Sequence, residues 1–164
     1  MLPRILKFLH EIGAVGVSGS LAACIVLVAT APTRSLIGYA AVRQGIAAVT
    51  QWLLVPSLAL VLVSGLLALA ITQAYHSAGW AWVKALLGIG MFEGTLLTID
   101  ASARKAAALS ALAASGGGDP ALLAQVIRTE RGGLWLLRGL SVANIALAVW
   151  RPRFGRLATA ATAS

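Results

Sequence analysis

Four long stretches of apolar residues decide what this chain can fold into. They cover residues 8–31, 52–74, 80–99 and 134–150. The hydrocarbon core of a bilayer is about 30 Å thick, and an α-helix crosses it with roughly 20 residues at about 1.5 Å per residue. Because each stretch is close to that length, we expect a multi-pass integral membrane protein. Its 164 residues are then one all-α domain, residues 1–164, built as a four-helix transmembrane bundle.

Composition and charge narrow the classes of function. Hydrophobic residues make up 59% of the chain, and 13 basic against 5 acidic residues give a formal net charge of +8. The basic residues gather near the ends of the apolar stretches, where they contact the anionic headgroups of the lipid bilayer. A nucleic-acid partner would need a solvated basic face with aromatic residues between the charges, and the sequence has none. Cys24 is the only cysteine, which excludes an intrachain disulfide and a thiolate metal cluster.

The segments between the apolar stretches also have helical patterns. Residues 35–50 carry apolar positions, and Arg34 and Arg43 supply polar anchors, which predicts an interfacial helix after the first span. The alanine-rich residues 101–115 continue the third span as a helix until three glycines stop it. An Asp-Pro pair is typical of a helix start, so a second arm covers residues 119–131. Together the arms predict an extramembrane helical hairpin between spans three and four, with Gly132 and Gly133 as its hinge into the fourth span.

Ionisable residues inside membrane spans are rare and costly, so each one is a functional hypothesis. His10 near the start of the first span and His76 near the end of the second lie on the same membrane side, because the chain reverses between them. Two neutral imidazoles that face each other across a bundle can hold a b-type haem. The structural alternative is that His10 forms a hydrogen bond to a neighbouring residue and that His76 is a hydrated residue at the membrane interface. Lys84 lies on that side too, where it pairs with Glu11, holds an anionic group such as a propionate, or extends toward the headgroups.

Glu93 and Arg138 lie deep in spans three and four, and counting from the span ends places them at nearly the same depth. An unpaired carboxylate there costs several kcal/mol. We therefore predict an ion pair between them, with either a structural role or a role in proton handling. Asn144, in the middle of span four, is predicted to form a hydrogen bond between helices.

Small residues indicate where helices approach each other. Gly16 and Ser20 in the first span, and Gly90 and Gly94 in the third, have the spacing that permits close packing of transmembrane helices. No phosphate-binding loop, dinucleotide fingerprint, serine nucleophile elbow or zinc-protease motif occurs in the sequence. The sequence therefore assigns no catalytic residue.

Several short motifs together resemble a known membrane family. They are Lys7-Phe8-Leu9-His10, Pro56 with Val63-Ser64-Gly65-Leu66, Trp82-Val83-Lys84 with Leu86-Leu87, Arg128 with Glu130, and Arg151-Pro152. This set, spread over nearly the whole chain, is similar to the HemJ-type protoporphyrinogen oxidases and the related CopD-like small membrane proteins. We also expect the bacterial inner membrane as the location.

The resemblance implies that His10 is a haem-iron ligand and that Lys84 belongs to a porphyrin site. HemJ-type enzymes carry further histidines after the first helix and late in the third, where this chain reads Ala31-Pro32-Thr33-Arg34 and Met91-Phe92-Glu93. The chain therefore looks like a divergent relative that binds haem b or a porphyrin for electron transfer. The alternative is a non-catalytic subunit that stabilises a larger membrane complex, with other membrane subunits or further copies of the chain as partners.

Overall fold

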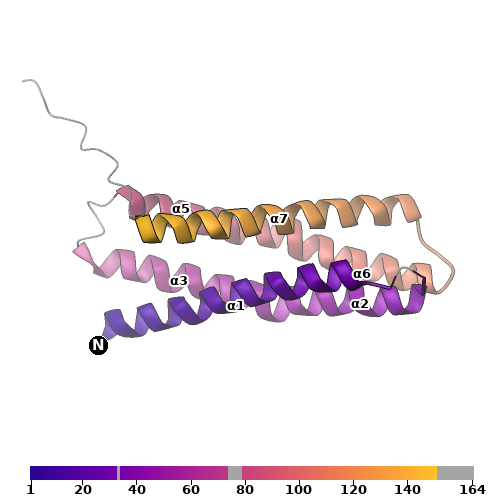
Figure 1. Ribbon diagram of the computed structural model, residues 1–164, viewed down its shortest axis with the longest axis horizontal. Helices are drawn as coiled ribbons and strands as arrows, with labels where there is room; N and C mark the ends of the chain where they lie inside the picture. The colour runs from indigo at the N-terminus through magenta and orange to yellow at the C-terminus, as the bar shows by residue number, and fades with distance from the viewer. Residues whose placement is uncertain (33, 74–78, 151–164) are drawn as a thin grey trace, which may run out of the picture.

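The structure is a computed structural model that describes residues 1–32, 34–73 and 79–150 (Figure 1). Its elements are α1 (Leu2–Thr30), α2 (Leu36–Val49), η1 (Thr50–Leu54), α3 (Val55–Ile71), α5 (Gly79–Gly94), η2 (Thr95–Asp100), α6 (Ala101–Ala114) and α7 (Pro120–Trp150). η1 and η2 are π-helical turns. All regular elements within the described ranges are helical, as the sequence predicted.

These elements join into four rods that run in alternating directions. The first rod is α1, the second α2–η1–α3, the third α5–η2–α6 and the fourth α7 (Figure 1). Each rod is long and apolar enough to cross a membrane, which confirms the predicted number of membrane-length helices. We call the end that holds the N-terminus, the end of α3, the start of α5 and the end of α7 the cavity end. The opposite end, with the turn between α6 and α7, is the hairpin end.

Local chemistry sets the turns at the hairpin end. The hydroxyl of Ser35 accepts a hydrogen bond from the backbone N–H of Gly38 at 3.1 Å, which caps the start of α2. Gly116 and Gly118 have φ angles of 85° and 93°, a conformation that glycine adopts without steric cost. A carboxylate oxygen of Asp119 then accepts a hydrogen bond from the N–H of Ala121 at 2.8 Å, and α7 begins. The predicted helix stop and restart are therefore confirmed.

The segment predicted as a separate interfacial helix is not separate. Residues 36–49 form α2, which continues through η1 into α3 as one rod (Figure 1). Pro56 lacks an N–H and crowds the turn before it, which would ordinarily kink or break a helix. The π-helical turn at Thr50–Leu54 precedes this proline and keeps the backbone helical. The second rod therefore has 36 residues, many more than the predicted span of 52–74.

The predicted hairpin exists, but its arms are continuous with the membrane-length helices. α6 extends the third rod, and α7 runs unbroken through Gly132 and Gly133, so these glycines form no hinge. At Gly133 an added Cβ would lie 3.0 Å from Cγ1 of Ile99 and 3.2 Å from Cγ2 of Thr98. The glycine therefore lets α7 pack closely on η2 rather than bend.

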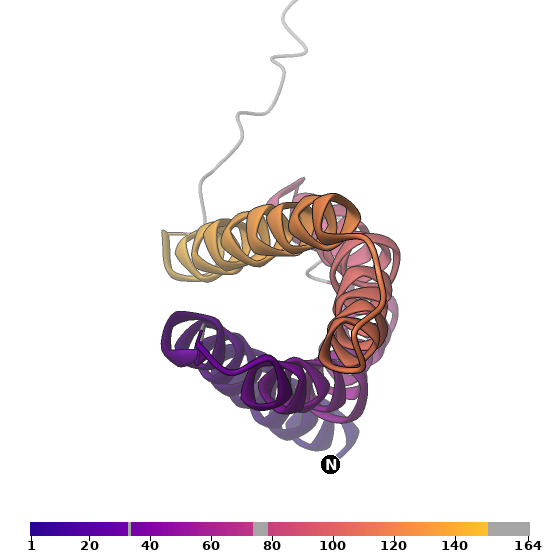
Figure 2. The same ribbon diagram turned by 90° about the vertical axis from the view of Figure 1, so that its right-hand side faces the viewer.

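The rods follow one another around an open arc when viewed along the bundle axis (Figure 2). α1 packs most extensively against α3, α2 against α6, and α7 against α6 and α5, whereas α1 and α7 touch only slightly. At Gly16 an added Cβ would lie 2.3 Å from the hydroxyl of Ser57, which confirms Gly16 as a close-contact position. No atom lies within 4 Å of a Cβ added at Gly90 or Gly94, so the predicted contact at these two glycines is not made within the described chain.

Candidate functional site: a cationic cavity at one end of the bundle

A cavity of about 530 Å³ lies at the cavity end, between α1, α3, α5 and α7. Four of the residues that the sequence singled out line it together: His10, Glu11, Lys84 and Asn144. They come from three different rods, so the fold brings them to one place. The volume falls within the range of about 300–1,000 Å³ that is usual for small-molecule sites.

The imidazole of His10 is held in one tautomer. Its Nδ1 lies 3.0 Å from the carbonyl oxygen of Val61 and 3.3 Å from the hydroxyl oxygen of Ser64. A carbonyl oxygen can only accept, so the proton is on Nδ1. The Ser64 hydroxyl itself donates to the carbonyl of Leu60 at 2.6 Å and is free to accept from the ring. Nε2 therefore keeps a lone pair that no described residue uses.

The absence of a side chain at Gly65 makes room for the imidazole of His10. A Cβ added at Gly65 would lie 3.4 Å from Cε1 and 3.5 Å from Nδ1 of His10, so the imidazole packs directly on the α3 backbone. Packing and the hydrogen bond to Val61 together fix the direction of Nε2. A histidine ligand of a metal centre is commonly oriented in this way, with the other ring N–H donated to a backbone carbonyl.

The charged lining of the cavity is mainly basic. Arg4, Lys7 and Lys84 contribute cations, and Glu11 contributes the anion among the lining residues, while most of the other walls are apolar. Lys84 is half-buried and does not form the predicted ion pair with Glu11. A cavity with this lining suits a ligand that has a large apolar body and anionic groups at one edge.

Asn144 contributes a polar group without a partner. Its side-chain carbonyl oxygen is buried and accepts no hydrogen bond, so the predicted hydrogen bond between helices through this oxygen is not formed. A buried amide oxygen left unpaired costs about 1–3 kcal/mol. Because Asn144 lines the cavity, a ligand or an ordered water in the cavity would remove this cost.

The predicted ion pair between Glu93 and Arg138 is wrong. Both side chains are exposed, and neither forms an ion pair with any described residue. Their depths agree, as the sequence suggested, but the two side chains leave their helices on different sides. The spacing along a span fixes depth, whereas the direction of a side chain depends on which face of its helix is packed.

An ion pair that the sequence reasoning missed joins Arg43 on α2 to Glu130 on α7. Only 2% of the Arg43 side chain and 1% of the Glu130 side chain are exposed. Sequence patterns place Arg43 in an interfacial helix and Glu130 in a hairpin arm, both outside the bundle, and therefore predict no buried contact between them. The sequence does contain an indication of this contact. Residues 35–50 and 119–131 have helical patterns and directly adjoin the apolar spans 52–74 and 134–150, so a continuous helix through each junction would include Arg43 and Glu130 in the bundle. The other ion pair in the described chain, Asp100 with Arg104 at 2.7 Å, is local to one helix.

Two further results bear on the site. His76, predicted as a second haem ligand, lies outside the described residues. Within those residues, no group of three or more His, Cys, Asp or Glu side chains could hold a metal ion.

Comparisons of the chain with protein-family models, curated proteins and solved structures gave no match.

Proposed function

We propose that this protein is a small integral membrane protein of the HemJ/CopD-like type, whose cavity binds haem b or a related porphyrin for electron transfer. The observation that carries the proposal is the orientation of His10. Its Nδ1–H donates to the carbonyl of Val61, and no described residue uses its Nε2 lone pair, on the wall of a cavity of about 530 Å³. The bacterial inner membrane is the proposed location.

The residues of the cavity fit such a ligand. Nε2 of His10 would bind the iron, the apolar walls would contact the macrocycle, and Lys84 would bind a propionate. Bound haem supplies one-electron chemistry. The chain itself orients the ligand, excludes water with its apolar walls, and keeps the proton of His10 on Nδ1 through the carbonyl of Val61.

The lengths of the rods support insertion with one end outside the bilayer. The second and third rods have 36 residues each, roughly 54 Å at about 1.5 Å per residue, against a hydrocarbon core of about 30 Å. We propose that the hairpin end, where α6 and the first part of α7 pack on α2, extends beyond the hydrocarbon. The predicted extramembrane hairpin then corresponds to this end of the bundle.

The test is a haem titration of the purified protein in detergent, followed by visible spectroscopy. We expect the wild-type protein to develop a Soret band at one haem per chain, and His10→Gly to lose it. Added imidazole should restore the band in His10→Gly, because it occupies the space of the missing ring and supplies the same nitrogen. Glu93→Gln, which changes an exposed group outside the cavity lining, is the control and should bind as the wild type does. A wild-type protein that binds no haem would overturn the proposal.

The second candidate function is that of a non-catalytic membrane subunit. Exposed Glu93 and Arg138, each within a helix of membrane length and unpaired in the described chain, favour it. In that case the purified protein is colourless, does not bind haem, and copurifies with a different membrane protein in a fixed ratio.

A further inference from the structure

Glu93 and Arg138 lie at the same level of the bundle, and the packing shows it. Gly133 of α7 contacts Thr98 and Ile99 of η2. The third and fourth rods run in opposite directions. Five residues along each rod toward the cavity end therefore lead from Gly133 to Arg138 on α7, and from Thr98 and Ile99 to Glu93 and Gly94 on the third rod. The two opposite charges are therefore level to within roughly one residue rise, about 1.5 Å.

This level is near the middle of the first rod. Gly88 on α5 contacts Leu62 on α3, so Glu93, five residues further along α5, is level with Ser57. Ser57 in turn contacts Gly16, the central residue of α1 (Leu2–Thr30). In a bilayer both charges would lie deep in the hydrocarbon, where an exposed ionised group without a partner is costly.

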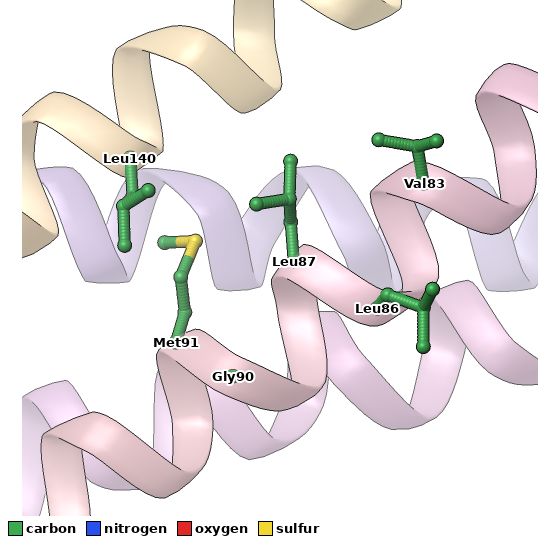
Figure 3. A pocket seen from close by; sticks show the side chains of 6 residues that line it. All are labelled: Val83, Leu86, Leu87, Gly90, Met91 and Leu140. Atoms are coloured by element: carbon green, nitrogen blue, oxygen red, sulfur yellow. The ribbon is translucent and has the colours of Figure 1, made fainter.

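The two side chains face in different directions within one copy of the chain. Glu93 is two residues from buried Met91, which places it roughly 200° around α5 from the packed face. Leu140 of α7 lines a groove toward α5 (Figure 3). Arg138 is two residues from Leu140, which places it roughly 200° around α7 from that groove. The chain cannot neutralise either charge with the other in the same copy.

Each charge is the centre of an exposed apolar stripe. On the third rod the stripe is Val83, Leu86, Gly90, Glu93 and Leu97, with steps of three, four, three and four residues. On α7 it is Trp135, Arg138, Val142, Ile145 and Val149, with the same steps. This spacing is that of a helix–helix seam. The apolar groove of about 430 Å³ in Figure 3 lies along the first stripe, with Leu86 and Gly90 in its lining.

The two stripes match residue by residue when one is placed against the other in antiparallel direction at equal depth. The facing positions are Val83 with Val149, Leu86 with Ile145, Gly90 with Val142, Glu93 with Arg138, and Leu97 with Trp135. Glycine faces a branched residue, so the helices can approach closely, and the acid faces the base. The stripes therefore complement each other in size and in charge.

We propose that the occupant of the third-rod stripe is a second copy of this chain, which presents its α7 stripe and pairs its Arg138 with Glu93. This rests on the proposed membrane insertion but not on haem binding. Copies related by an axis along the membrane normal keep every residue at its own depth and every helix in its own direction. Because the two stripes are on different faces, the contact is head-to-tail and repeats around a closed ring. One contact then neutralises both intramembrane charges of every copy.

The first test exchanges the charges in lipid nanodiscs, with native mass spectrometry of the protein without haem as the readout. Glu93→Arg and Arg138→Glu should each weaken association by something on the order of 100-fold, the effect of breaking one buried charge pair. The double variant Glu93→Arg/Arg138→Glu should assemble again. Arg128→Glu, the same change at an exposed position of α7 outside the stripe, is the matched control and should assemble normally. A monomeric wild type, or a double variant as weak as the single ones, would overturn the proposal.

The second test needs no charged variant to fold. Leu86→Cys combined with Ile145→Cys, in membranes treated with a mild oxidant, should give a ladder of covalent multimers, because position 86 of each copy faces position 145 of the next. Leu86→Cys alone and Ile145→Cys alone, each with the buried native Cys24, should stay monomers on the gel. Dimers from a variant with only one of the two new cysteines would indicate a symmetric contact. No ladder from the double variant would indicate that another protein or lipid covers the stripe. Either result contradicts the head-to-tail ring.

Discussion

At the hairpin end, Arg43 and Glu130 are buried against each other, whereas at the cavity end His10 and Lys84 line an open volume and form no ion pair with any described residue. The hairpin end is filled by small side chains: Ala103, Ala106 and Ala107 of α6 are buried, so α6 packs closely on α2. This difference in the burial and pairing of charges indicates that the two ends of the bundle have different roles. Charges at the hairpin end hold the rods together, and charges at the cavity end remain available to a ligand.

The largest effect is expected from the buried ion pair. Glu130→Gln leaves the Arg43 guanidinium buried without its counterion, and breaking such a pair costs about 3–5 kcal/mol in the free energy of unfolding. Replacing both residues together, as Arg43→Met with Glu130→Leu, should recover most of the loss. Chemical unfolding in detergent measures both variants. A Glu130→Gln protein as stable as the wild type would show that the charges at the hairpin end do not stabilise the fold, and would contradict the distinction between the two ends.

A smaller effect is expected where the ends meet, at the contact of α1 with α3. Gly16→Ala places a Cβ within 2.9 Å of Ser57 Cβ and closer still to its hydroxyl, so the helices must move apart. Overpacking of this kind costs about 1–3 kcal/mol. Gly19→Ala is the matched control, since nothing lies within 4 Å of its Cβ, and it should be neutral or slightly stabilising. In thermal melts, Gly16→Ala should therefore lower the melting temperature, while Gly19→Ala should leave it unchanged or raise it slightly.

The smallest effect is expected at the cavity, and in binding rather than in stability. Lys84→Gln removes a cation from the lining, which should weaken haem binding about tenfold, equivalent to about 1.4 kcal/mol, while the unfolding curve stays unchanged. Lys105→Gln makes the same chemical change at an exposed position of α6 and should alter neither quantity. If Lys84→Gln instead lowers stability and leaves binding intact, the lysine belongs to the fold and not to the site.

The sequence was sufficient for features that depend on position along the chain. Apolar length predicted four rods, and depth from the span ends brought His10 and Lys84 to one end of the bundle, whereas the position of Asn144 in the same cavity was not predicted. It was insufficient for features that depend on direction around a helix. Glu93 and Arg138 have matching depths but diverge, because the packed face of each helix is set by its neighbours.

Segment boundaries caused the other errors. Arg34, Arg43 and Pro56 suggested that a new helix begins after an interfacial segment. A π-helical turn carries the helix through instead, and this turn has no distinctive composition. Once residues 36–49 were placed outside the bundle, Arg43 could not be expected to reach Glu130. Tertiary packing, not local propensity, decides both points.

The π-helical turns also set the rotational phase of the two long rods. Each such turn holds one residue more than an α-helical turn, so it offsets the side chains before it from those after it by roughly 100°. Deleting one residue from Thr50–Leu54 would leave α3 and its cavity wall in place but turn α2 about its axis, and Arg43 would swing away from Glu130. The π-helical turn thus fixes the rotation of α2 relative to α3 about the axis they share. α2 can direct Arg43 toward Glu130 while α3 directs Val61 and Ser64 toward His10, and the one extra residue in the turn keeps both orientations.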